Sequence, residues 1–320
     1  MTRAFLFPGQ GSQQIGMGKA LSEAFAPARD VFQEVDDALS QKLSKLMWEG
    51  PESDLTLTEN AQPAIMAASL AIVRVLQREG GLDFATHARV VAGHSLGEYT
   101  ALCAAGAFSL ADAARLLKAR GRAMQDAVPV GLGAMSALLG AEIDMAEEAA
   151  KEAVTAALPG EAGAVCVVAN DNAPGQVVIS GTKAAVERAG EIAKAKGAKR
   201  AMALNVSAPF HSPLMQPAAD RMAEELAKIV IRPPTAPLVA NVTAAETSEP
   251  ETIRRLLVEQ VTGRVRWRES MLGLRALGVG ITVEVGGSKV LTGMVKRIDR
   301  ELQTLTLDTP GDIEAFARTL

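Results

Sequence analysis

Residues 89–97 read Arg-Val-Val-Ala-Gly-His-Ser-Leu-Gly, and they decide which fold we expect. The run up to Gly93 is largely apolar and predicts a buried strand, while the alanine-rich residues after Gly97 predict a helix. A serine at a sharp strand-to-helix turn exposes its hydroxyl, and glycines two residues to either side let strand and helix approach closely. Ser95 is therefore a candidate nucleophile. The alternative is a tight turn whose serine only caps the helix.

The segments around this turn repeat the order strand then helix. We expect a glycine-rich turn at 8–13, strands at 5–7 and 89–93, and helices at 19–39, 63–77 and 110–128. This order predicts a parallel sheet that helices cover on both faces. The last third continues with a strand at 237–241, a final core strand at 282–285, and helices at 217–229, 251–260 and 270–277.

The pattern changes after Pro129. We expect helices at 145–157 and 183–196, a turn at 170–175, and strands at 134–139, 165–169, 176–180 and 200–205. This is the β-α-β-β-α-β order of a ferredoxin-like unit. The sequence therefore predicts an α/β fold with two parts. They are an α/β-hydrolase-like catalytic domain, residues 1–128 and 205–320, and an inserted ferredoxin-like subdomain, residues 129–204.

The composition excludes several classes of protein. The chain of 320 residues is 48% hydrophobic and 22% charged, which is typical of a globular protein with a sizeable core. Its net charge of −4 gives no reason to expect nucleic acid or a membrane surface as partner. Cys103 and Cys166 lack disulfide or metal-ligand spacing. Because residues 1–8 predict a short strand rather than a signal peptide and no apolar run would span a bilayer, we expect a cytoplasmic protein.

A serine nucleophile needs a base, and the chain has 3 histidines. His94 adjoins Ser95 on a tight turn, so its side chain should point away from the hydroxyl. His87 lies in a polar segment and should be solvated. His211 lies in the loop 205–213 at a strand end, where catalytic groups collect, and is the candidate base by elimination. No acidic residue stands out as a third triad member, which argues against an ordinary hydrolase.

An arginine stands out on the helix expected at 110–128. Apolar residues at helical spacing form one stripe, and Arg115, Lys118 and Arg122 lie on the opposite side. Arg120 instead falls on the side that the helix buries. A buried guanidinium needs a partner, and its fork fits a carboxylate. The alternatives are an internal salt bridge, a snorkelling side chain, or a substrate carboxylate such as that of a malonyl group.

Six stretches, spread over the whole chain, resemble the malonyl-CoA:acyl-carrier-protein transacylases and the acyltransferase domains of polyketide and fatty acid synthases. They follow one another in the family's order and are together highly specific. The stretches are 7–13 (Phe-Pro-Gly-Gln-Gly-Ser-Gln), 93–98 (Gly-His-Ser-Leu-Gly-Glu), 120–121 (Arg-Gly), 170–181 (Asn-Asp-Asn-Ala-Pro-Gly-Gln-Val-Val-Ile-Ser-Gly), 210–212 (Phe-His-Ser) and 284–286 (Glu-Val-Gly).

The resemblance implies a role for each matching residue. Ser95 would be acylated and His211 would be the base. Arg120 would hold the malonyl carboxylate. The backbone N–H groups of Gln10 and Leu96 would form the oxyanion hole.

Two further residues are implied to belong to the substrate-binding set. Phe210 resembles the malonyl-selecting form of the family, since the methylmalonyl-selecting form usually has serine there. Gln260 matches a glutamine near the backbone carbonyl that holds the histidine, so a missing triad acid is expected. The chain departs from the family after Gln260, where it reads Val-Thr-Gly-Arg at 261–264 and relatives often place a proline.

The resemblance also implies the partners. They are malonyl-CoA and an acyl carrier protein whose phosphopantetheine accepts the malonyl group, with no cofactor or metal, and the family-level expectation is a monomer. Because such carriers are acidic, we expect a basic patch near the site, made of Arg254, Arg255, Arg264, Arg266, Arg268 and Arg275. Two rival functions are a thioesterase or other serine hydrolase, and a non-catalytic protein that binds the carrier.

Overall fold

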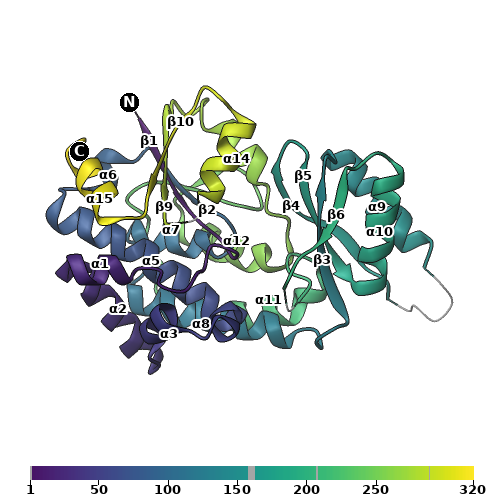
Figure 1. The fold of residues 1–320 in the computed structure, drawn as a ribbon, viewed down its shortest axis with the longest axis horizontal. Helices are drawn as coiled ribbons and strands as arrows, with labels where there is room; N and C mark the ends of the chain where they lie inside the picture. The colour runs from purple at the N-terminus through teal and green to yellow at the C-terminus, as the bar shows by residue number, and fades with distance from the viewer. Residues whose placement is uncertain (1, 158–162, 207, 288) are drawn as a thin grey trace.

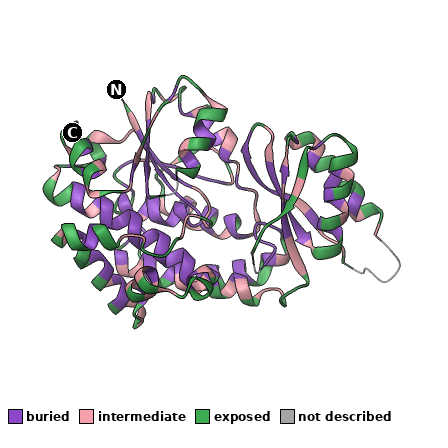
Figure 2. Cartoon of the chain, in the orientation of Figure 1, coloured by how far each residue is buried: buried purple, intermediate pink, exposed green. Residues whose placement is uncertain are grey.

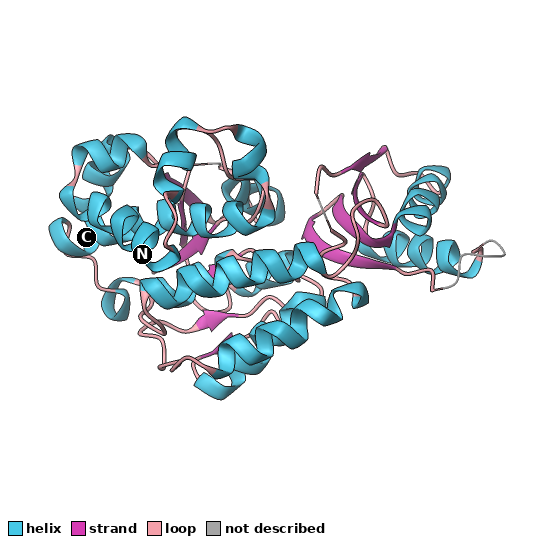
Figure 3. Cartoon of the chain, turned by 90° about the horizontal axis from the view of Figure 1, so that it is seen from below, coloured by secondary structure: helices cyan, strands magenta, loops and turns pink. Residues whose placement is uncertain are grey.

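The structure is a computed structural model that describes residues 2–157, 163–206, 208–287 and 289–320. Ser207, part of the loop expected to carry His211, lies outside the described residues. The chain folds into a large part built on one sheet and a smaller part built on a second sheet, which lie side by side (Figure 1). The small sheet and its helices stand at one end of the molecule, as the view from below also shows (Figure 3).

The larger sheet has the strand order β10-β9-β1-β2-β7-β8. Its strands are parallel except for the antiparallel pair β7–β8. β1 and β2 at its centre are apolar and almost fully buried, as strands of a parallel sheet covered on both faces must be. The strand bounds are β1 Arg3–Phe7, β2 Val90–Gly93, β7 Leu238–Val239, β8 Glu246–Thr247, β9 Ile281–Val285 and β10 Gln303–Leu307.

Alternate residues of β1 face two separate apolar cores. Phe5 and Phe7 pack with one set of helices, which includes α2, α5, α7, α8 and α11. Ala4 and Leu6 point the other way, toward α13 and α14. This alternation follows from the period-2 geometry of a strand. The buried residues gather along both sheets and the inward faces of the helices (Figure 2), so the prediction of a sheet covered on both faces is confirmed.

The helices of this larger part vary from one turn to six. Their bounds are α1 Lys19–Ala24, α2 Ala26–Leu39, α3 Leu43–Glu49, α4 Glu52–Thr56, α5 Thr58–Glu79, α6 Phe84–His87, α7 Gly97–Ala104, α8 Leu110–Asp126, the 3-10 helix η1 Pro213–Met215, α11 Gln216–Ala227, α12 Pro250–Thr262, α13 Trp267–Gly273, α14 Val290–Ile298 and α15 Pro310–Ala317. Within the described residues, no helix is both long enough and apolar enough to cross a membrane.

The smaller sheet has the order β4-β5-β3-β6, and all of its pairs are antiparallel. Its elements are β3 Gly133–Leu139, α9 Ile143–Thr155, β4 Cys166–Ala173, β5 Gln176–Thr182, α10 Lys183–Ala195 and β6 Arg200–Ala203. The two helices bury one face of the sheet in an apolar core of its own. The predicted fold class is confirmed, whereas the limits 129–204 of the subdomain stay a prediction.

Three sequence-based expectations were wrong in detail. The helix expected at 19–39 is two helices, because Phe25 is extended and Pro27 starts the second one. The turn expected at 170–175 is shorter, since β4 continues to Ala173 and only Pro174 and Gly175 turn. β9 is not the last strand, since β10 pairs with it at the sheet edge. β10 is half exposed and lacks the continuous apolar run that marks a core strand.

Candidate active site

Ser95 lies at the turn between β2 and α7, with a backbone φ of 54° that is uncommon for a residue with a side chain. The glycines around it have no room for a side chain. A Cβ on Gly93 would lie 1.9 Å from the backbone of Gly97, and a Cβ on Gly97 would lie 2.2 Å from the carbonyl oxygen of Phe7. The three backbones therefore meet closely, as the sequence predicted for this elbow.

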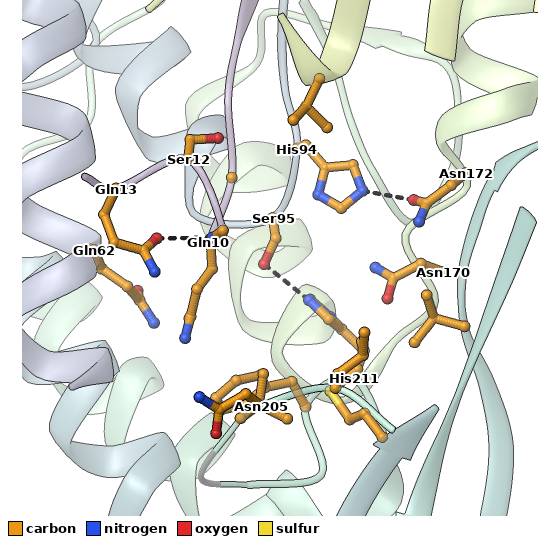
Figure 4. A pocket seen from close by; sticks show the side chains of 18 of the residues that line it. Gln10, Ser12, Gln13, Gln62, His94, Ser95, Asn170, Asn172, Asn205 and His211 are labelled. Carbon is orange, nitrogen blue, oxygen red and sulfur yellow. Dashed lines mark hydrogen bonds between the residues drawn. The ribbon is translucent and has the colours of Figure 1, made fainter. Parts of the chain in front are cut away.

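His211 approaches Ser95 from a loop 116 residues further along the chain. Its Nε2 lies 2.8 Å from the Ser95 Oγ, the bond drawn in Figure 4. Its Nδ1 lies 2.8 Å from the Gln260 carbonyl oxygen and 3.1 Å from that of Gly263. Because carbonyl oxygens only accept hydrogen bonds, Nδ1 carries the proton and Nε2 can accept from the serine hydroxyl. Carbonyl oxygens thus stand where a triad acid would, despite the missing proline after Gln260.

Burial, and next to it the charge of Arg120, lower the pKa of His211 to about 3. The ring is 4% exposed, so the charged imidazolium would lose most of its hydration. His211 is therefore neutral at physiological pH, which is the form that can take a proton.

The other two histidines face away from the nucleophile. His94 has its Nε2 2.8 Å from the Asn172 Oδ1, and its ring turns toward that residue in Figure 4. Burial also lowers the pKa of His94. Among the described residues, the hydrogen-bond partners of the His87 ring are Asp83 and Thr86 of its own turn. The elimination that led to His211 agrees with these positions.

Arg120 on α8 is 1% exposed and reaches the same serine. Its Nη2 donates to the Ser95 Oγ at 3.2 Å and to the Gln260 Oε1 at 2.8 Å, and its Nη1 donates to the Gln62 Oε1 at 2.9 Å. None of these acceptors carries a charge. In the described part of the chain no ion pair joins Arg120 to a carboxylate, so neither the salt-bridge nor the snorkelling alternative applies.

The nearest acid in this network, Glu98, accepts from the Gln260 Nε2. It is 0% exposed, and this burial raises its pKa to about 8, against the lowering effects of Gln260 and Arg120. Glu98 is therefore protonated at neutral pH. The positive charge of Arg120 is left for an anion that enters the site.

Gln260 holds the reacting groups from behind. Its carbonyl oxygen accepts from His211, its Oε1 accepts from Arg120, and its Nε2 donates to the Ser95 carbonyl oxygen at 2.9 Å. The side chain is 0% exposed and does not line the cavity. Its contacts place Gln260 next to Ser95, His211 and Arg120, and its assignment to the substrate-binding set stays a prediction.

Two backbone N–H groups near Ser95 are available. Gln10 lies in the turn after β1, and Leu96 precedes the first turn of α7. Neither N–H has a protein acceptor among the described residues. The N–H of Ser95 itself donates to the Asn241 Oδ1 at 2.8 Å. Unused donors of this kind are what a developing oxyanion requires.

These groups open into a cavity of about 290 Å³. One wall comes from the loop after β1, and the opposite wall comes from the small sheet (Figure 4). Phe210 contributes a ring that is 7% exposed. The lining also includes Gln13, Asn170, Asn172 and Val178, which belong to stretches that carried the resemblance. Further lining residues were not candidates from the sequence, namely Gln62, Met124, Met135, Asn205, Leu291 and Met294.

Two missed residues had detectable signals. Gln62 directly precedes a strongly apolar run that begins at Pro63, and a buried amide at such a position needs a partner. Asn241 ends the strand that we expected at 237–241. Polar residues at the carboxyl ends of parallel strands commonly line sites.

The expected basic patch is not present as such. Each of its six arginines forms an ion pair with a carboxylate, so their charges are largely compensated. The pairs are Arg254–Glu251, Arg255–Glu259, Arg264–Glu147, Arg266–Glu269, Arg268–Glu142 and Arg275–Asp299.

Comparisons with known proteins agree with this site. The family model of the acyl transferase domain matches residues 4–307. The malonyl CoA-acyl carrier protein transacylase of Bacillus subtilis strain 168 is 46% identical over 318 residues, 99% of this chain and 96% of the relative. The chain belongs to the malonyl CoA-acyl carrier protein transacylase family. The transacylase of Escherichia coli K12, also of this family, is 45% identical over 312 residues, 98% of this chain and 97% of the relative.

Solved structures of the same family superpose closely. The acyl-carrier-protein S-malonyltransferase of Bartonella henselae has a TM-score of 0.95 and 54% identity, and the match covers 100% of this chain and 99% of the other. A malonyl-transacylase in complex with a type II polyketide synthase acyl carrier protein has a TM-score of 0.94 and 42% identity, with 100% of both chains covered. The resemblance found in the sequence is thereby confirmed.

Proposed function

We propose that this transacylase moves a malonyl group from malonyl-CoA, through an ester on Ser95, to the phosphopantetheine thiol of an acyl carrier protein. The observation that carries the proposal is one arrangement of three side chains. The Ser95 Oγ lies within hydrogen-bond distance of a neutral His211 and of Arg120, which forms no ion pair with a carboxylate of the described residues. A nucleophile, a base and a cation at one point fit an acyl group that carries its own acid.

In the first half-reaction, the Ser95 Oγ attacks the thioester carbonyl carbon while His211 Nε2 takes the hydroxyl proton. The N–H groups of Gln10 and Leu96 hold the negative oxygen of the tetrahedral intermediate. The carbon–sulfur bond then breaks. His211 gives its proton to the departing sulfur. The products are free coenzyme A and a malonyl ester on Ser95.

The second half-reaction reverses these steps with a different thiol. The phosphopantetheine thiol of the carrier gives its proton to His211, and its sulfur attacks the malonyl ester. The bond to the Ser95 Oγ breaks, and that oxygen recovers the proton from His211. The result is malonyl-carrier and free enzyme, a ping-pong exchange that supplies extender units for fatty acid or polyketide synthesis.

The selection of malonyl groups is assigned to Arg120 and Phe210. The guanidinium pairs with the free carboxylate of the malonyl group in a charge-assisted contact. Gln62 and Gln260 hold it in place without neutralising it. The Phe210 ring narrows the cavity beside the acyl group, which disfavours branched acyl chains.

We also propose that the enzyme acts in the cytoplasm, as a monomer and without a cofactor. The support for the location is the pair of free thiols, Cys103 and Cys166, which are typical of a reducing compartment. Every proton and bond of the two half-reactions is accounted for by Ser95, His211 and the two substrates. Light scattering of the purified protein tests the monomer, and dialysis against a chelator tests the reaction without a metal.

The main test is intact-protein mass spectrometry after brief mixing with equal concentrations of malonyl-CoA and acetyl-CoA. The wild type is expected to gain one malonyl group and to lose it when the phosphopantetheine-bearing acyl carrier protein is added. Ser95→Ala is expected to gain none.

Two other outcomes correspond to rival functions. Rapid loss of the malonyl group to water without carrier identifies a thioesterase. A wild type that never forms an adduct, with both thioesters intact, identifies a carrier-binding protein and overturns the proposal.

A further inference from the structure

We infer that Asn241 is a positioning residue that keeps Ser95 in its reactive conformation by binding the peptide groups on both sides of the elbow. Asn241 follows β7, the strand that pairs with β2 in the larger sheet. It therefore lies beside the carboxyl end of the strand that carries the nucleophile. Its side chain is 1% exposed and does not line the cavity, so it acts through Ser95 and not on a substrate.

The Asn241 amide uses both of its ends on the elbow. Its Oδ1 accepts from the Ser95 N–H at 2.8 Å, and its Nδ2 donates to the Gly93 carbonyl oxygen at 2.7 Å. A third, longer contact joins the Oδ1 to the Gln260 Nε2 at 3.4 Å. Because one end must accept and the other must donate, asparagine matches this pair of groups, whereas an ionised aspartate would match only one.

We call these two hydrogen bonds of Asn241, to the Ser95 N–H and the Gly93 carbonyl oxygen, the clamp. The conformation of Ser95 explains why it is needed. A φ of 54° is sparsely populated for a residue with a Cβ, and it persists where the surroundings hold it. The Ser95 carbonyl oxygen is held by the Glu98 N–H at 3.0 Å and by the Gln260 Nε2. Among the described residues, only Asn241 accepts a hydrogen bond from its N–H. The same bond removes the Ser95 N–H from the oxyanion site and leaves that place to Leu96.

Asn241 is itself anchored on both sides. Its carbonyl oxygen accepts from the Arg266 N–H at 2.9 Å, and the preceding Ala240 N–H donates to the Ala245 carbonyl oxygen at 3.0 Å. The clamp is thus mounted on the end of a strand and a tight turn rather than on a free loop. A displacement of the nucleophile by about 1 Å can slow a reaction about 100-fold, which sets the expected size of the effect.

The test measures the rate of Ser95 acylation by malonyl-CoA in single-turnover mixing, read by intact-protein mass spectrometry. It rests on the proposed function, since it needs a wild type that forms the malonyl adduct. Asn241→Ala is expected to slow acylation about 100-fold, with the half-saturating malonyl-CoA concentration changed less than about 3-fold. Asn60→Ala is the matched control. Its buried amide bonds to the Asp54 carbonyl oxygen, Gln41 and Lys118 and, among the described residues, to no group of the elbow, so it is expected to lower the melting temperature but not the rate.

Asn241→Asp gives a readout that a purely structural role would not produce. Protonated, this side chain can donate to the Gly93 carbonyl oxygen and accept from Ser95, whereas ionised it repels that carbonyl. Gln260, which contacts its Oδ1, also bonds to Glu98, Arg120 and His211, the titratable groups of this network. Burial beside Glu98 favours protonation as the pH falls. Its acylation rate is expected to rise about 10-fold as the pH falls from about 7 to about 5.5, a range in which Glu98 stays protonated, while the rates of the wild type and Asn241→Ala stay nearly flat.

The outcomes separate the two proposals. If the wild type forms no adduct, the proposed function fails, and this inference fails with it. If the wild type reacts but Asn241→Ala reacts within about 3-fold of it, only the clamp is refuted. A pH profile of Asn241→Asp that runs parallel to that of Asn241→Ala also refutes the clamp. If Asn241→Ala does not fold, the profile of Asn241→Asp decides.

Discussion

The segments that carry Ser95 and His211 reach one hydrogen bond by different means. Both residues have side chains and a positive φ, 54° and 55°, and their reacting atoms lie 2.8 Å apart. The conformation of Ser95 is prepared by its neighbours in sequence, Gly93 and Gly97, which let three backbones touch. The ring of His211 is oriented by the carbonyl oxygens of Gln260 and Gly263, which follow it by 49 and 52 residues. The turn that presents the nucleophile is thus specified by its local sequence, with Asn241 as a distant support, whereas the base is placed by tertiary packing.

The largest expected effect comes from a substitution in the strand-to-helix turn that carries Ser95. In Gly97→Ala the new Cβ would lie 2.2 Å from the Phe7 carbonyl oxygen, so the backbone must shift. We expect acylation to fall by more than about 1,000-fold and the free energy of unfolding to fall by about 2–4 kcal/mol. Gly273→Ala is the control, because a Cβ there meets nothing within 4 Å. Urea unfolding and adduct formation measure both effects. A Gly97→Ala protein that acylates at the wild-type rate would contradict the close-packed elbow.

Removal of His211 tests the part of the site that tertiary packing brings to Ser95. His211→Ala is expected to slow acylation by about 100- to 10,000-fold, because the serine loses its proton acceptor. Binding of malonyl-CoA, measured by calorimetry, should persist. His87→Ala should leave both quantities unchanged, since that ring forms its hydrogen bonds within its own turn. Equal losses in the two variants would mean that His211 has no special place in the reaction.

A smaller effect is expected from removal of Arg120, which bonds to Ser95 and whose charge acts on His211. Arg120→Ala should lower the preference for malonyl-CoA over acetyl-CoA about 100-fold, since a charge-assisted contact contributes about 2–3 kcal/mol. Acetyl groups should then be accepted better than by the wild type. Arg122→Ala, on the same helix and paired with Glu59 near the surface, is the control. Competition between the two thioesters in one tube measures this preference. An unchanged preference would rule out the contact between Arg120 and the malonyl carboxylate.

The smallest effect concerns the pH dependence of stability, which tests whether the His211 ring is buried. Its pKa is about 3 in the folded protein, below the ordinary 6.5. Below about pH 6.5 the unfolded chain binds a proton that folded His211 refuses, so stability falls as the pH drops through this window. Between pH 7 and pH 5 the wild type should lose about 2 kcal/mol more unfolding free energy than His211→Gln. Acylation should stay nearly constant over this range, because the base stays neutral. Parallel losses of stability would indicate a solvated ring.

The sequence alone identified the parts that depend on short-range rules. The elbow followed from two glycines around Ser95, the small subdomain from its strand and helix order, and the buried position of Arg120 from helical periodicity. The resemblance extended these to Gln10, Leu96, Phe210 and Gln260 but did not show their positions. Gln260 lies behind the site rather than in the cavity wall.

Tertiary structure alone decided the long-range contacts. It brought His211 and Asn241 to Ser95 across 116 and 146 residues, and it gave carboxylate partners to the arginines that we expected to be free. The reason is physical. Steric limits and side-chain periodicity act over a few residues and can be read from order along the chain. A hydrogen bond between distant segments instead depends on which strands lie side by side and on which polar groups the packing buries together.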